Sequence, residues 1–239
     1  MDIKKKYFDM VKDGITKAYT AQSGKIKEIA ETFGQCMENG GVVQLFGVKH
    51  GEEFVNELNY RAGGIAPFHA LRFRNLVLKE MYDQAKIDSG EAYDDLTLID
   101  KFEQVFKLDD RDMYCLVSND GTEKLVIELA KRAKEKGQKV VGVVNLKSYE
   151  KAGGKLLDYC DLYLDMMADD PDVAVDLDGL KVGQIGNTVS NVMAQMLTAE
   201  IYNYYVSHGK EAPVLLSANV KGADVHNNSL TDPYEGRIR

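Results

Sequence analysis

Two short polar loops contain most of the residues of this chain that could do chemistry. They are residues 47–51 (GVKHG) and residues 118–122 (SNDGT), and each follows an apolar run and precedes a helical pattern. Side chains of Lys, His, Ser, Asn and Thr can donate hydrogen bonds to an anion or to a hydroxyl group. Backbone N–H groups at the start of a helix add further donors. The two loops therefore predict a site for a small polar ligand.

We take seven residues of these loops as ligand-binding candidates and His50 as a further candidate for catalysis. The seven are Gly47, Lys49, Ser118, Asn119, Asp120, Gly121 and Thr122. Neither loop has the glycine spacing of a Walker A or dinucleotide motif, so a nucleotide site is not supported. Helix capping is the alternative role for the polar side chains of residues 118–122, with Asp120 as the N-cap.

The loops lie within an alternation of apolar strands and one-sided helices. Residues 113–117 are continuously apolar and residues 42–46 are apolar apart from Gln44, as in strands that are buried on both faces, and residues 139–144 and 162–164 continue the pattern. Such an alternation predicts a mainly parallel sheet covered by helices on both sides. In open sheets of this kind ligands bind beyond the carboxyl ends of the strands, where both loops are expected.

No linker divides the chain, so we expect one domain over residues 1–239. Its parts are N-terminal helices at about 1–39, an α/β core at about 42–216 and a polar C-terminal tail at 217–239. Within the core, residues 185–208 read as one long helix and residues 214–216 as a further short strand. We expect the charged run at 108–112 to be solvated surface.

Composition limits the partners and the compartment. The chain has 239 residues, with 38 acidic and 30 basic side chains and a net charge of −8. This balance argues against a nucleic-acid partner, which needs a basic surface. No apolar run approaches a membrane span, and the first twenty residues do not resemble a secretory signal. The three cysteines are far apart in the sequence, which fits the reduced cytoplasm.

The order of these motifs resembles the SIS (sugar isomerase) domain family. Ser118, Gly121 and Thr122 match its S-x-S-G-x-T loop, and Ala133 and Gly137 match the A-x-x-x-G end of its following helix. The stretches RAGGIAP (61–67) and SANVKGADVHN (217–227) are similar to a poorly characterised bacterial branch near the phosphoheptose isomerases. The resemblance implies a three-layer α/β/α sandwich around a five-stranded parallel sheet.

The resemblance also implies a function. Members that isomerise sugars move a proton between neighbouring carbons through an enediol, and we expect no cofactor. By the motif match Glu57 is the general base, assisted by His50, and Glu53 stands where phosphoheptose isomerases have a histidine. His226 is a candidate for closing the site from the tail. We expect a homodimer or homotetramer with sites near the subunit interface, a sugar derivative as ligand, and no metal.

Two departures from the family pattern keep other functions open. Asp120 replaces the usual Ser, and a carboxylate repels a phosphate, so Lys49 could hold the anion while Asp120 binds a hydroxyl or an amino group. Glu57 could instead be an ordinary helix carboxylate paired with Arg61. The alternatives to an aldose–ketose isomerase are therefore a non-catalytic phosphosugar sensor and a sugar-ether lyase.

Overall fold

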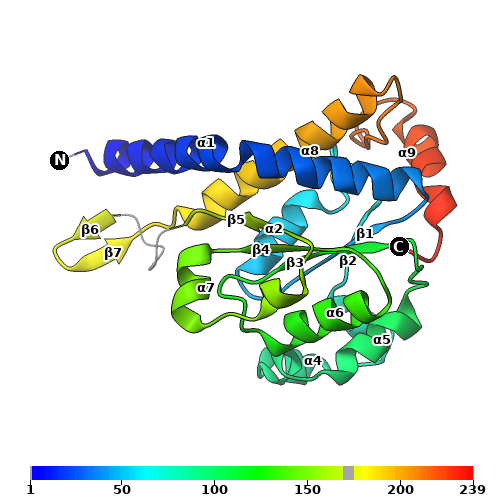
Figure 1. Cartoon of the computed structure of the whole chain (residues 1–239), viewed down its shortest axis with the longest axis horizontal. Helices are drawn as coiled ribbons and strands as arrows, with labels where there is room; N and C mark the ends of the chain where they lie inside the picture. The colour runs from blue at the N-terminus through cyan, green and yellow to red at the C-terminus, as the bar shows by residue number, and fades with distance from the viewer. Residues whose placement is uncertain (1, 169–174, 239) are drawn as a thin grey trace.

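The centre of the structure is a parallel sheet of five strands in the order β2-β1-β3-β4-β5 (Figure 1). The structure is a computed structural model that describes residues 2–168 and 175–238. The strands are β1 (Val43–Gly47), β2 (Phe68–Ala70), β3 (Met113–Val117), β4 (Val140–Val144) and β5 (Leu162–Asp165). The predicted fold class, a five-stranded parallel sheet between two helical layers, is confirmed.

The strands are apolar because both of their faces are covered. In β1, Val43 and Leu45 pack in one core cluster and Phe46 packs in the other. Successive side chains of a strand point to opposite faces, so a strand with helices on both sides is apolar at most positions. Gln44 in β1 is buried and polar, and its amide is hydrogen-bonded to Asp112 and His69. Every residue of β1, β3 and β4 is buried.

One helical layer contains α1 (Ile3–Glu38), α2 (Gly51–Leu58) and α8 (Gly186–Ser207), and α1 lies along α8 (Figure 1). The expectation of several helices at about 1–39 is wrong, since this segment is one continuous helix. Its glycines do not break it, and two of them allow α8 to pack closely. A Cβ on Gly34 would lie 2.3 Å from the Tyr204 ring, and one on Gly14 would lie 2.9 Å from Val189.

The N-terminal half of α1 extends beyond the sheet (Figure 1). Buried residues of α1 begin at Ala18, and Phe8 is 64% exposed. A two-stranded antiparallel hairpin, β6 (Val175–Leu177) and β7 (Leu180–Val182), lies beside this half, and the sequence patterns did not predict it. The Tyr7 hydroxyl donates to the Gln184 carbonyl over 2.7 Å, which attaches the end of α1 to the segment before α8.

The other layer consists of shorter helices packed on the opposite face of the sheet (Figure 1). They are α3 (Phe73–Leu78), α4 (Gln84–Asp88), η1 (Glu91–Tyr93), α5 (Thr97–Val105), α6 (Lys124–Glu135), α7 (Leu146–Ala152) and η2 (Leu156–Tyr159). Each contributes side chains to the second core cluster, or packs against it. These helices form the connections between β2, β3, β4 and β5.

One expectation about the C-terminal part of the chain is wrong, and the structure adds a helix to the polar tail. Residues 214–216 form no strand but only one antiparallel bridge, between Val214 and Ile65. The tail at 217–239 is partly helical, with α9 (Ala223–Thr231) and η3 (Asp232–Tyr234). Polar side chains rather than an apolar stripe hold α9 in place: Asn227 accepts from the Leu216 N–H over 2.8 Å and donates to its carbonyl over 2.9 Å.

The charged run at 108–112 is also not all solvated surface, because Asp112 is 2% exposed. Its carboxylate accepts hydrogen bonds from the backbone of Val42 and Asp109, from the Gln44 amide and from the Arg237 guanidinium. Four donors compensate the cost of burying the charge. The carboxylate therefore joins β1, the start of β3 and the C-terminal end of the chain.

The turn after β3 depends on a glycine. Gly121 has φ +70, a conformation that L side chains rarely adopt, and a Cβ there would lie 2.3 Å from the Tyr149 ring. Its carbonyl accepts from the Lys155 and Leu156 N–H groups. Gly121 thereby allows residues 118–122 to pack against α7.

Arg237→Ala should lower the free energy of unfolding by about 3–5 kcal/mol, because it leaves the Asp112 charge buried without its partner. Urea denaturation measures this loss. Arg111→Ala is the matched control, since it removes a surface ion pair with Asp109 and should cost less than about 1 kcal/mol. Equal losses in the two variants would contradict the role given to Arg237.

Gly121→Ala should destabilise the fold more than Gly137→Ala. Both glycines have positive φ, but nothing lies within 4 Å of a Cβ on Gly137. Gly137→Ala should therefore cost only the backbone strain, about 1–2 kcal/mol, while Gly121→Ala adds about 1–3 kcal/mol for displacing Tyr149. Thermal and urea unfolding of the two variants give the difference, and equal costs would argue against the close approach.

Candidate functional site

The two predicted ligand loops lie side by side at the carboxyl ends of β1 and β3. These strands are neighbours, and the last residues of both, Gly47 and Val117, are paired in the register. From β1 the chain crosses to β2 on one side and then to β3 on the other, so the sheet order reverses here. Such a switch point leaves a crevice between the loops, which is where open α/β sheets bind ligands.

The first loop turns tightly into α2. A Cβ on Gly51 would lie 2.8 Å from the Val117 carbonyl oxygen, so glycine allows α2 to begin against β3. Lys49 has φ +55, and its exposed ammonium lies 5.6 Å from the centre of the Tyr93 ring. His50 is exposed immediately before α2. The structure thus brings Gly47, Lys49 and His50 to the crevice from the β1 side.

The second loop satisfies most of its own hydrogen-bond donors. The buried Ser118 hydroxyl accepts from the Gly121 N–H over 2.8 Å and is bonded to the Glu123 carboxylate. Asp120 Oδ1 accepts from the Thr122 N–H over 3.0 Å and from its hydroxyl over 2.7 Å. Asp120 therefore fixes the turn before α6, whose N-cap is Glu123 rather than Asp120.

This bonding weakens the case for a phosphate in the second loop. A phosphate there would have to replace Asp120 and Ser118 as acceptors of the loop donors. It would also lie near the carboxylates of Asp120 and Glu123, and each like-charge pair costs about 1–4 kcal/mol at 4 Å, depending on screening. Asn119 is different, because its side chain is exposed while its carbonyl accepts from the Asn145 N–H.

Glu57 lies on the side of α2 that faces α8. It forms an ion pair with Arg61, and its Oε1 accepts from the Gln195 amide over 2.8 Å. Its side chain is 22% exposed. The pairing with Arg61 that the spacing allowed is therefore present, and a second donor from α8 fixes the carboxylate. Glu53 is exposed one turn earlier.

His226 lies on the same side of the molecule as Gln195. Both residues line a groove of about 600 Å³ between α8 and the C-terminal segment. His226 Nε2 lies 2.9 Å from the Val214 carbonyl oxygen, so the ring holds the C-terminal helix against the preceding segment. The predicted residues thus divide into two groups, one at the β1–β3 crevice and one, Glu57 and His226, around Gln195.

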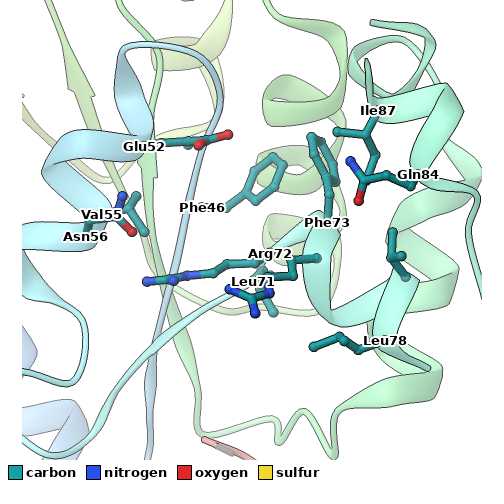
Figure 2. Close-up of a pocket in the computed structure, with 13 residues that line it drawn as sticks. Phe46, Glu52, Val55, Asn56, Leu71, Arg72, Phe73, Leu78, Gln84 and Ile87 are labelled. Atoms are coloured by element: carbon teal, nitrogen blue, oxygen red, sulfur yellow. The ribbon is translucent and has the colours of Figure 1, made fainter. Parts of the chain in front are cut away.

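A second pocket lies at the carboxyl ends of β1 and β2, with a volume of about 460 Å³. Figure 2 shows Glu52 and Asn56 of α2 along one side, Phe73, Gln84 and Ile87 along the other, and Arg72 between them. The sequence analysis did not select any of these residues. Two arginines shortly after β2, Arg72 and Arg74, could have indicated this pocket. The strand itself has only three residues.

Arg72 sets the electrostatics of this pocket. Partial burial raises the pKa of the Glu52 carboxyl, and the positive charge of Arg72 opposes that rise. Burial, and secondly the charge of Arg72, lowers the pKa of His69 to about 4, so His69 is neutral near pH 7. His69 Nδ1 lies 2.7 Å from Gln44 Oε1 within the sheet. His69 is thus part of the core, and Glu52, Arg72 and Arg74 are the charged side chains that line the pocket.

The described residues contain neither a cluster of metal ligands nor a membrane-spanning helix. No group of three or more His, Cys, Asp or Glu side chains there is arranged to hold a metal ion. None of the helices that the structure describes is long and apolar enough to cross a membrane. The absence of a metal and of a cofactor from the working protein stays a prediction.

Comparisons with known proteins show the family. Residues 6–145, more than half of the chain, match the SIS domain family. A UPF0309 protein from Halalkalibacterium halodurans is 28% identical over 241 residues, covering 97% of this chain and 94% of the relative. A UPF0309 protein from Listeria monocytogenes is 27% identical over 244 residues, covering 97% and 96%.

The fold agrees with this result. A phosphoheptose isomerase from Francisella tularensis has a similar structure, with a TM-score of 0.55 at 18% sequence identity, over 84% of this chain and 96% of that one. The motif around residues 118–122 and the sheet topology therefore lead to the same family. The chain is a member of the SIS domain family, with UPF0309 proteins among its relatives.

Proposed function

We propose that this protein is a sugar isomerase of the aldose–ketose type, which binds a sugar derivative in the crevice between β1 and β3. The observation that carries the proposal is the meeting of residues 47–51 and 118–122 at the switch point of the sheet, in a chain of the SIS family. The similar phosphoheptose isomerase is by name an isomerase of a phosphorylated sugar, which supports the substrate class.

In this proposal the Glu57 carboxylate is the general base. It removes the proton from the carbon next to the carbonyl, the electron pair forms the enediol double bond, and the carbonyl oxygen takes a proton from His50. Glu57 then returns its proton to the former carbonyl carbon, while the hydroxyl group on the first carbon gives its proton to His50 and becomes the new carbonyl. Arg61 and Gln195 both donate to Glu57 and hold it in one orientation, which supports a positioned base.

The loops bind the sugar. The exposed side chains of Asn119 and Thr122 meet its hydroxyl groups, and Ser118 holds the turn that presents them. Asp120 accepts a hydrogen bond from a sugar hydroxyl or amino group through Oδ2, because Thr122 donates to Oδ1. His226 closes the groove on the α8 side.

The proposal includes the assembly and the compartment. We expect a cytoplasmic homodimer or homotetramer with its sites near the subunit interface. The exposed apolar residues of the two long helices support an interface, since Phe8 on α1 is 64% exposed and Tyr202 on α8 is 53% exposed. In this proposal no metal takes part, so the reaction relies on the Glu57 carboxylate and on the hydrogen-bond donors of the two loops.

A non-catalytic sugar sensor is the second candidate. One observation favours it: the Glu57 carboxylate is already occupied by two donors, so it competes poorly for a substrate proton. A sensor binds the same ligand in the same crevice and leaves it unchanged. A sugar-ether lyase uses the same base but expels the ether substituent, so its product differs.

Glu57→Gln should abolish proton exchange but preserve binding. The first measurement is a thermal-shift screen of matched phosphorylated and free sugars, including amino sugars, which finds a ligand by its stabilisation. NMR in D₂O then follows deuterium entering the carbon next to the carbonyl. Glu57→Gln should slow this entry about 100-fold or more, because a general base contributes that much.

Glu53→Gln is the control, since Glu53 is an exposed carboxylate on the same helix. It should leave both the exchange and the binding unchanged. Normal exchange in Glu57→Gln would remove Glu57 as the base. A wild-type protein that binds a sugar without any exchange would favour the sensor, and loss of an ether substituent would favour the lyase.

A further inference from the structure

The pocket beyond β1 and β2 has the size and lining of a small-molecule site. Its volume of about 460 Å³ lies within the range of ligand pockets. Phe46 and Phe73 give it an aromatic side, with the two rings 5.9 Å apart. Asn56 and Gln84 add amide groups at its edges (Figure 2). Aromatic surface suits the carbon face of a sugar, and amides suit its hydroxyl groups.

The pocket also concentrates positive charge that has no carboxylate partner. Four of the six arginines in the described part of the chain form ion pairs: Arg61, Arg111, Arg132 and Arg237. The other two are Arg72 and Arg74, and both line this pocket. Within the described residues neither of their side chains forms an ion pair or a hydrogen bond. Glu52 is the one acidic side chain among the lining residues.

This pocket is continuous with the predicted crevice. Gly47 lines the pocket and is also the first residue of the loop 47–51. On the opposite side, the Phe73 ring lies 5.8 Å from the Tyr93 ring, over which the Lys49 ammonium lies. One ligand can therefore contact the pocket and the β1 loop at the same time.

We propose that this pocket, rather than the loop 118–122, receives the anionic group of the sugar derivative, with Arg72 and Arg74 as the cations that bind it. The inference rests on the proposed function for the identity of the ligand. A guanidinium binds phosphate and carboxylate alike through two parallel N–H groups, so either group on the sugar fits. The loop 118–122, with its donors bonded to Ser118 and Asp120, then binds only uncharged or cationic groups of the sugar.

The test separates three possible anion sites with single substitutions. Arg72→Gln and Arg74→Gln remove the pocket cations, Lys49→Gln removes the loop cation, and Asp120→Ser removes the repelling carboxylate. Isothermal titration at constant ionic strength measures binding of inorganic phosphate, then of glucosamine 6-phosphate against glucosamine, and of glucuronate against glucose. The two sugar pairs distinguish a phosphate from a carboxylate as the group recognised.

Arg72→Gln should weaken binding of inorganic phosphate, or of whichever anionic sugar binds, by about tenfold or more, since it removes a charge-assisted contact. Arg74→Gln should weaken it in the same direction, and Arg72→Lys should recover part of the loss. With inorganic phosphate, which has no amino group or sugar hydroxyl for Asp120 to accept from, Lys49→Gln and Asp120→Ser should change the affinity less than threefold. Arg72 is exposed, so unchanged melting temperatures should confirm that its variants are folded.

The inference is overturned if Lys49→Gln weakens anion binding, or Asp120→Ser strengthens it, while Arg72→Gln has no effect. It is also overturned if neither phosphate nor an anionic sugar binds the wild-type protein. Failure of the proposed function looks different: anions bind in an Arg72-dependent manner, yet no sugar undergoes proton exchange. Exchange on neutral sugars that does not depend on Arg72 supports the isomerase and rejects the anion pocket.

Discussion

The buried carboxylate of Asp112 is the interaction on which the arrangement of the sheet depends. A charge that is 2% exposed is tolerable only with full hydrogen bonding, and here it receives four donors. Those donors come from the segment before β1, from β1, from the turn before β3 and from Arg237. Gln44 extends the network to His69 on β2. Three neighbouring strands and the C-terminal end of the chain are thus fixed relative to one another.

This network lies toward the amino ends of the strands, and the candidate sites lie at the carboxyl ends. The separation leaves the loops after β1, β2 and β3 to carry polar and charged residues without endangering the core. The main buried charge network, with Asp112 and Arg237, is therefore separate from the candidate ligand residues, although Gly121 in the loop 118–122 also contributes to the packing. This separation also explains why only one end of the sheet has unpaired guanidinium groups among the described residues.

The sequence was sufficient for the elements whose apolar pattern is strong, and insufficient where polar contacts decide the structure. Residues 113–117 were predicted as a strand because each of them is buried and apolar, and residues 185–208 as a long helix because apolar residues recur along the segment. The helix α9 was missed because Asn227 and His226 hold it through backbone contacts, and β2 because three residues are too few. Asp112 was taken as surface, since a buried carboxylate cannot be distinguished from a solvated one by type.

The candidate site residues of α2 lie on two different sides of the helix, which the motif match did not predict. Residues four apart on a helix share a face, so Glu53 and Glu57 lie on one side of α2 while Glu52 and Asn56 lie on another. Glu57 is turned to Gln195 on α8, and Glu52 and Asn56 line the Arg72 pocket. A motif match predicts which residue type stands at a position, but it does not predict which side chains surround that residue. The proposed base and the proposed anion pocket can serve one sugar only if the ligand reaches both of these sides of α2, because the space beside Gly47 is filled by the backbone of Gly51.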